Sequence, residues 1–123
     1  MTFLDKLAPY VHWGLRLSLA ATFIYHGISK FPPDGFAPVV GGSMAVAWAV
    51  AIAEVAAGVL LIVGGFSREI FTRLGGLLVM VIMTGAIYMV HAKNGWNAMN
   101  GGMEFQVLML ATGLYFAARG NKV

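Results

Sequence analysis

The sequence predicts an all-α integral membrane protein, a single domain built as a four-helix antiparallel bundle with both termini in the cytoplasm. Two properties of the composition indicate a membrane. Hydrophobic residues make up 59% of the 123 residues and charged residues 11%, and the mean hydropathy is +0.80. An ordinary soluble domain is about 45–50% apolar and about 25% charged. The third observation is that the apolar residues gather in four long runs.

Each of the four runs is about as long as a membrane-spanning helix. They contain roughly 18–23 residues, and about 20 residues cross the ~30 Å of hydrocarbon as a helix. The first run lacks a cationic lead followed by a small-residue cleavage site, and it contains Arg16 and His26, so we interpret it as a retained helix rather than a signal peptide. The four runs are residues 11–30, 44–66, 70–92 and 101–118.

The connections and the cations set the expected topology. Residues 31–43 contain three prolines and three glycines and form a loop, whereas residues 67–69 leave room only for a tight turn. Cations are enriched on the cytoplasmic side of membrane proteins. Both termini and the tight turn are therefore expected in the cytoplasm of a multi-pass protein of the bacterial inner membrane. That side would hold Lys6, Arg68, Arg73, Arg119 and Lys122, and the outer side Lys30 and Lys93.

Charged side chains within the runs indicate a buried pair. A charge at the middle of a membrane costs about 2.5–3.5 kcal/mol even on the most lenient scale, so each one calls for a partner. Arg16 lies more than a turn inside the first run, and Glu54 lies near the centre of the second, at a depth that differs by about 6 Å at 1.5 Å per residue. We predict that Arg16 and Glu54 form a buried ion pair, which either fixes helix register or belongs to a proton path.

A second group of polar residues lies near the predicted outer face. At the end of the first run, His26 and Lys30 are four residues apart and share one helical face. The third run ends in Thr84, Tyr88 and His91, which are also expected on one face. The position of each of these residues can also be explained without a ligand. Each can be an interfacial side chain, and Glu104 can be an acid favoured by a helix N-terminus. The group near the outer face is His26, Lys30, His91, Trp96 and Glu104.

Other kinds of site are not expected. The chain has no cysteine, which excludes disulfides, iron–sulfur clusters and thiolate zinc sites. Its eight methionines are spaced as packing residues, so no metal site is predicted. No dinucleotide fingerprint is present. Nucleic acid is not an expected partner, because eight scattered Lys and Arg residues do not make a basic stripe.

Several short motifs, taken in order, resemble those of the DoxX family of small bacterial membrane proteins, whose members look like the DoxD subunit of thiosulfate:quinone oxidoreductase. The resemblance implies a four-helix membrane domain that spans residues 1–123 and, by analogy with some members, a quinone-linked or redox-stress complex. The motifs are Arg16-Leu17, FIYHGISK at 23–30, AEVAAG at 53–58, GGFSR at 64–68, His91, Gly95-Trp96 and Gly102-Met103-Glu104.

The residues and the resemblance together favour a subunit of a quinone-linked membrane oxidoreductase. A quinone head group would bind near the outer face, with His26 and His91 as hydrogen-bond donors, Lys30 and Glu104 setting their protonation, and Trp96 covering the ring. No covalently bound cofactor is expected. Expected partners are the lipid bilayer, redox partner subunits and further copies of the chain. The alternatives are a non-catalytic assembly subunit of a redox complex, a small transporter, and a haem protein that uses the two histidines.

Overall fold

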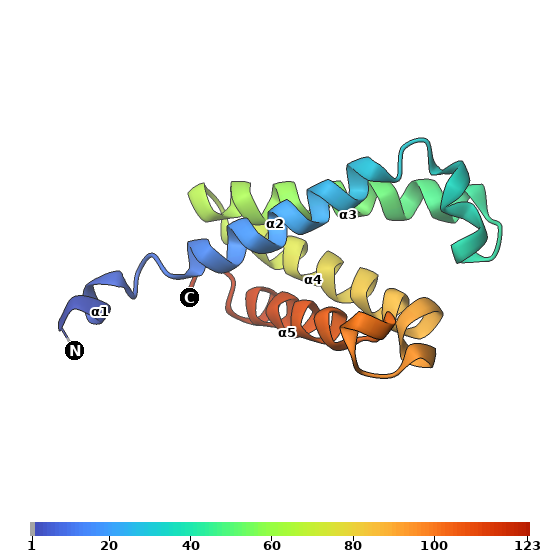
Figure 1. The fold of residues 1–123 in the computed structure, drawn as a ribbon. Helices are drawn as coiled ribbons and strands as arrows, with labels where there is room; N and C mark the ends of the chain where they lie inside the picture. Colours follow the sequence, from blue (N-terminus) through green and yellow to red (C-terminus); the bar gives the residue numbers. More distant parts are fainter. Residues whose placement is uncertain (1) are drawn as a thin grey trace.

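A computed structural model describes residues 2–123, and over these residues the protein is entirely helical, as predicted (Figure 1). A short helix α1 precedes four long ones. The connection after α2 contains two short 3₁₀ turns, Pro33–Gly35 and Ala37–Val40, and the connection after α4 contains a π-helical turn, Ile87–His91, followed by 3₁₀ turns at Ala92–Asn94 and Ala98–Asn100. The helices are α1 (Thr2–Leu7), α2 (His12–Ser29), α3 (Met44–Phe66), α4 (Glu69–Ala86) and α5 (Glu104–Arg119).

The long helices lie close to the predicted runs, although α5 begins at Glu104 rather than at residue 101. Two further differences concern α1 and the end of α4. Helix α1 was not predicted, because its six residues have too few apolar positions for a periodicity to show. The π-helical turn at the end of α4 also breaks the expected face. A π turn contains more residues than an α turn and so changes the direction of the side chains that follow. Thr84 and Tyr88 are exposed, Tyr88 to 87%, whereas His91, at the end of the π-helical turn, is partly buried.

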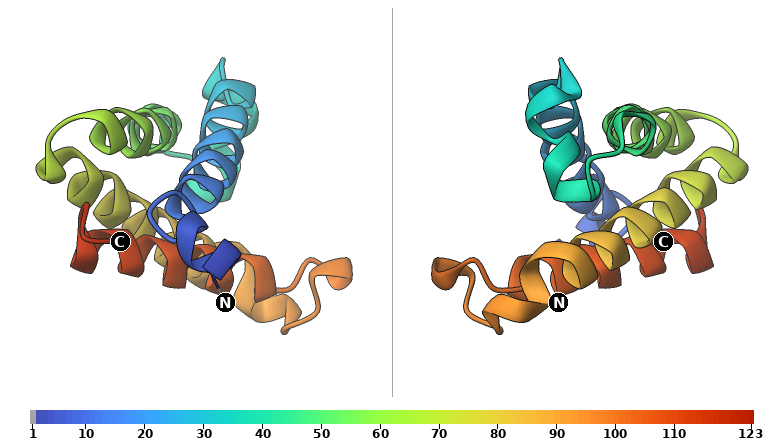
Figure 2. Two further views of the ribbon diagram at one scale, coloured as in Figure 1. Left: turned by 90° about the vertical axis from the view of Figure 1, so that its left-hand side faces the viewer. Right: turned by 90° about the vertical axis from the view of Figure 1, so that its right-hand side faces the viewer.

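Each long helix packs on its neighbour in the chain: α2 on α3, α3 on α4 and α4 on α5. The pair α2–α3 therefore forms one arm and the pair α4–α5 the other (Figure 1). End-on views show that the two arms cross at an angle (Figure 2). The arms meet near the α3–α4 turn, where the C-terminus also lies, and they separate toward the two longer connections (Figure 1).

Small residues bring the helices together. A Cβ atom on Gly58 of α3 would lie 2.9 Å from the carbonyl oxygen of Ala20 in α2, and one on Gly76 of α4 would lie 2.6 Å from the carbonyl oxygen of Gly113 in α5. These backbones are therefore in direct contact, as in closely packed membrane helices. The apolar core between the arms is Leu19, Phe23, Ala57, Leu61, Val79, Met83 and Phe116.

Arg16 is fully buried where the arms meet, but its partners are not those predicted. Its Nη1 donates to the carbonyl oxygen of Leu61 (2.7 Å) and to Thr72 Oγ1 (2.9 Å), and its Nη2 donates to Asn121 Oδ1 (2.9 Å). The predicted pair of Arg16 with Glu54 is wrong, because the Glu54 carboxylate pairs with Lys30 instead. Similar depth in the membrane did not identify the partner of Glu54, because depth does not show which face of α3 packs against α2.

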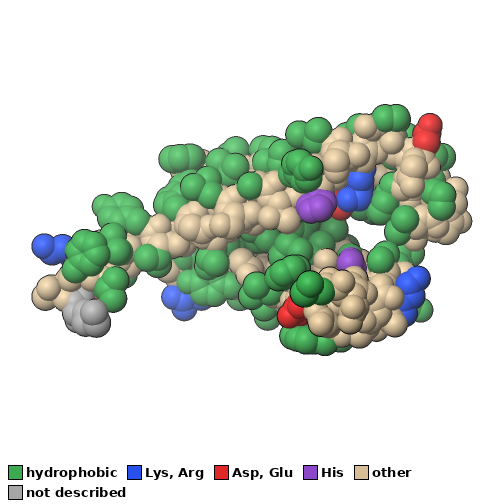
Figure 3. All heavy atoms as spheres, in the orientation of Figure 1, with side chains coloured by type: hydrophobic (Ala, Val, Ile, Leu, Met, Phe, Trp, Pro, Cys, Tyr) green, Lys and Arg blue, Asp and Glu red, His purple; other side chains and the backbone are tan. Residues whose placement is uncertain are grey.

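Two helical segments are long and apolar enough to cross a membrane among the described residues, Met44–Phe66 and Glu69–Asn94. The sequence predicted four. Helix α2 carries Arg16 and two histidines within its 18 residues, and α5 has only 16 residues. Apolar side chains nevertheless cover much of the face drawn in Figure 3, and every long helix has exposed apolar side chains. Examples are Leu17 on α2, Ile52 on α3, Val81 on α4 and Leu108 on α5, which are 54–69% exposed.

Candidate functional site

A cavity of about 680 Å³ lies between the two arms, where they separate. The hollow is visible on the face of the molecule drawn in Figure 3. Helices α2 and α3 form one wall, and α4, its π-helical turn and α5 form the other. The 3₁₀ turn Ala37–Val40 is also part of the lining, because Ala37 and Val40 are anchored against Ala47 of α3.

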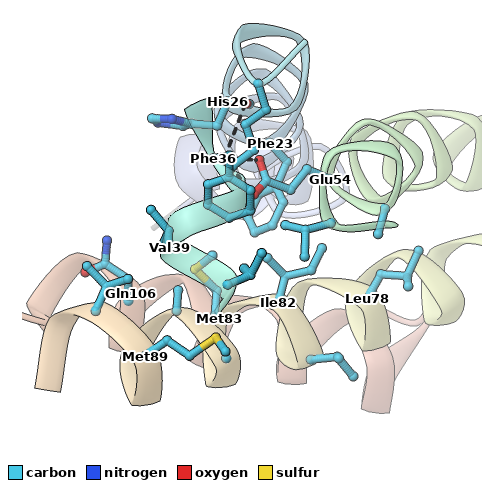
Figure 4. Close-up of a pocket in the computed structure, with 18 of the residues that line it drawn as sticks. Phe23, His26, Phe36, Val39, Glu54, Leu78, Ile82, Met83, Met89 and Gln106 are labelled. Atoms are coloured by element: carbon cyan, nitrogen blue, oxygen red, sulfur yellow. Dashed lines mark hydrogen bonds and ion pairs between the residues drawn. The ribbon is translucent and has the colours of Figure 1, made fainter. Parts of the chain in front are cut away.

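Most of the side chains that line the cavity are apolar. Phe23, Phe36, Ile82, Met83 and Met89 surround it (Figure 4). Ligand pockets in proteins are typically about 300–1,000 Å³ and have apolar walls with a few polar groups. The cavity therefore has the size and character of a site for a small apolar ligand that carries a few hydrogen-bonding atoms.

An ion pair between Lys30 and Glu54 is the main polar feature of the wall. Lys30 Nζ lies 2.9 Å from Glu54 Oε1 and 3.1 Å from Oε2, and only 18% and 8% of the two side chains are exposed. The ammonium also lies 4.9 Å from the centre of the Phe36 ring. The pair joins the end of α2 to the middle of α3 and places one carboxylate and one ammonium in a mostly apolar cavity.

Two of the predicted histidines line the cavity from opposite arms. His91 Nδ1 lies 2.8 Å from the carbonyl oxygen of Gly101. A carbonyl can only accept, so Nδ1 carries the proton and Nε2 is the nitrogen left for a ligand. His26 is exposed at the side of the cavity, and its ring points away from Glu54 (Figure 4).

The other two predicted residues lie outside the cavity lining. Glu104 Oε1 accepts a hydrogen bond of 2.7 Å from the backbone N–H of Ala98, so its carboxylate holds the connection between α4 and α5. Trp96 is 56% exposed in the same connection. The structure thus brings together His26, Lys30, Glu54 and His91 but not Trp96 and Glu104.

Gln106 is a polar residue of the cavity that the sequence analysis missed. It lies in the first turns of α5 and lines the cavity together with Met109, one turn further on. It also lines a smaller groove of about 360 Å³ between α2 and α5, which shares Thr22, His26, Gln106 and Met109 with the main cavity. A signal was present, because Gln106 is the only amide side chain within the mostly apolar stretch 105–118.

Comparisons with known proteins agree with the resemblance seen in the sequence. The DoxX family model matches residues 12–92, which include α2, α3, α4 and the π-helical turn. An uncharacterized protein of Haemophilus influenzae is 31% identical over 128 residues, which cover 98% of this chain and 90% of that protein. A Bacillus subtilis protein named "Putative oxidoreductase CatD" is 31% identical over 112 residues, which cover 88% of this chain and 78% of that protein. No solved structure matches the chain.

Proposed function

The chain belongs to the DoxX family, whose members are membrane proteins, and on this premise we propose that it is a quinone-binding subunit of a membrane oxidoreductase. The observation that carries the proposal is the apolar cavity between the arms, which has an ion pair and a histidine in its wall. The name of the Bacillus subtilis relative supports a role in redox chemistry.

A quinone suits the chemistry of this cavity. Its ring needs apolar walls, its two carbonyl oxygens need hydrogen-bond donors, and its reduction to a quinol takes up two electrons and two protons. His91 Nε2 supplies a donor when the ring is protonated and an acceptor when it is neutral. The carboxylate of Glu54 is a second group in the wall that can carry a proton. The electrons would come from a partner subunit.

The proposal includes a membrane orientation. Helices α2 to α5 would each cross the inner membrane, with both termini and the α3–α4 turn in the cytoplasm. The two termini lie at the same end of the molecule (Figure 1), which agrees with an even number of crossings. The cavity would then lie toward the outer face. A cysteine added after Val123 should be labelled by a membrane-impermeant reagent only after the inner membrane is opened, and labelling of intact spheroplasts would contradict this orientation.

Binding of a short-tailed quinone to the purified protein tests the function. Titration calorimetry in detergent should show saturable binding to the wild type. Gly85 lines the cavity, and a Cβ atom there would meet nothing within 4 Å, so Gly85→Phe should fill the cavity and abolish binding. Gly14→Phe is the matched control, because Gly14 lies outside the cavity lining and is equally uncrowded.

The outcomes separate the proposal from its main alternative. Retention of binding by Gly14→Phe and its loss in Gly85→Phe supports a quinone in the cavity. If the wild type shows no saturable binding, or if the two variants bind equally well, the quinone site is wrong. The role of a non-catalytic assembly subunit then takes its place.

A further inference from the structure

The side chain of Gln106 contains an unsatisfied buried polar atom. Its Oε1 is fully buried and has no hydrogen-bond partner, and it is the only such side-chain atom among residues 2–123. Most buried polar atoms in proteins are hydrogen-bonded, and leaving one unpaired destabilises the fold. An unpaired amide at the wall of a cavity therefore calls for an explanation.

Packing alone does not require an amide at this position. The side chains that follow Gln106 in α5, such as Val107 and Met109, are apolar, and an apolar side chain of similar length would occupy the same volume. Glu104, two residues earlier, is bonded to the connection before α5, whereas Gln106 is part of the cavity wall. The protein thus leaves the oxygen of this amide without a partner in the wall of the cavity.

We infer that Gln106 binds the ligand of this cavity directly and that its amide contacts both redox states of a quinone, an inference that rests on the function proposed above. The oxygens of an oxidised quinone only accept hydrogen bonds, whereas the hydroxyl groups of a quinol also donate them. An amide has two N–H donors and a carbonyl acceptor on one rotatable group. Rotation of the Gln106 amide therefore presents Nε2 to a quinone and Oε1 to a quinol.

The position of Gln106 fits a ligand that has a polar head and an apolar tail. Gln106 stands where the main cavity meets the groove between α2 and α5, and Phe105, Leu108 and Met109 give that groove apolar walls. A ring in the cavity with its tail in the groove would pass the amide at the junction. Lys30 is less suited to this role, because its ammonium only donates and is already paired with Glu54.

The variant Gln106→Met tests the inference, since methionine has a similar length and no strong hydrogen-bonding group. Binding of a short-tailed quinone and of its quinol, kept reduced under anaerobic conditions, is measured by titration calorimetry. Both dissociation constants should rise about tenfold, which corresponds to ~1.4 kcal/mol. Leu110→Met is the control on the next turn, because Leu110 is partly buried but lines neither the cavity nor the groove, and its dissociation constants should stay within about twofold of the wild-type values.

The thermal stability of the unliganded protein provides a readout that does not depend on the ligand. Because Gln106→Met removes an unpaired buried oxygen, the Tm of the variant should equal or exceed that of the wild type. A lower Tm would show that the amide stabilises the fold, which would overturn the inference. Wild-type binding with unchanged affinities in Gln106→Met would overturn the inference alone, whereas absence of binding to the wild type would overturn the proposed function and the inference with it.

Discussion

Replacement of Arg16 by methionine removes the polar centre of the junction between the two arms. The guanidinium donates to the carbonyl oxygen of Leu61 in α3, to Thr72 in α4 and to Asn121 after α5, and it lies 4.9 Å from the centre of the Phe116 ring. One side chain of α2 therefore connects all the other long helices.

The size of the effect follows from two opposing contributions. A hydrogen bond to a charged group contributes about 1.5–3 kcal/mol, so the three bonds to Leu61, Thr72 and Asn121 contribute roughly 4.5–9 kcal/mol in sum. Removing a buried charge regains several kcal/mol of desolvation, and Thr72 and Asn121 remain bonded to each other at 2.6 Å. The net loss in the free energy of unfolding should be about 2–4 kcal/mol.

Unfolding by SDS in mixed micelles measures this loss. Arg16→Lys should fall between the wild type and Arg16→Met, because an ammonium keeps the charge but lacks the planar fork of donors. Arg68→Met is the control for removal of an exposed arginine, and it should change the free energy of unfolding by less than about 0.5 kcal/mol. If Arg16→Met is as stable as Arg68→Met, the assignment of Arg16 as the centre of the junction is refuted.

Three further predictions concern packing and the cavity wall. Lys30→Met and Glu54→Leu should each lower the free energy of unfolding by about 3–5 kcal/mol, since each leaves one buried charge unpaired. The double variant should regain part of the loss, and strictly additive losses would contradict the pairing. Gly76→Ala should lower the free energy of unfolding by about 1–3 kcal/mol because its Cβ would meet the α5 backbone, and equal stability would contradict the close contact. Gly85→Ala, in the same helix but uncrowded, should raise the free energy of unfolding by about 0.5–1 kcal/mol, and a clear loss would contradict the open space at its Cβ.

The sequence predicted the four long helices well because their pattern is local. An apolar run of fixed length between turn residues indicates a helix without knowledge of its neighbours. The bounds of α3 agree with the predicted residues 44–66. Burial of Arg16, Leu19 and Phe23 on one face of α2 also follows from helical periodicity alone.

The candidate site was predicted only in part because it depends on contacts between distant residues. His26, Lys30 and His91 line one cavity as expected from their depth, but depth alone also favoured Glu104, which instead holds a connection. The partner of Glu54 depends on which side of α3 faces the end of α2, and no periodicity within one helix gives that. Gln106 was missed because its only signal, a single amide in a mostly apolar stretch, does not show whether the side chain has a partner, and only the structure shows that its oxygen lacks one.

The measurement that tests the central claim most directly is photolabelling with an azidoquinone, followed by mass spectrometry of the labelled peptides. A quinone bound between the arms should label peptides that contain Val46–Glu54 of α3 and Leu78–His91 of α4 and its π-helical turn, because both segments line the cavity. Excess unlabelled quinone should remove this label. Labelling spread over the lipid-facing side chains, unaffected by excess quinone, would contradict a quinone site in the cavity.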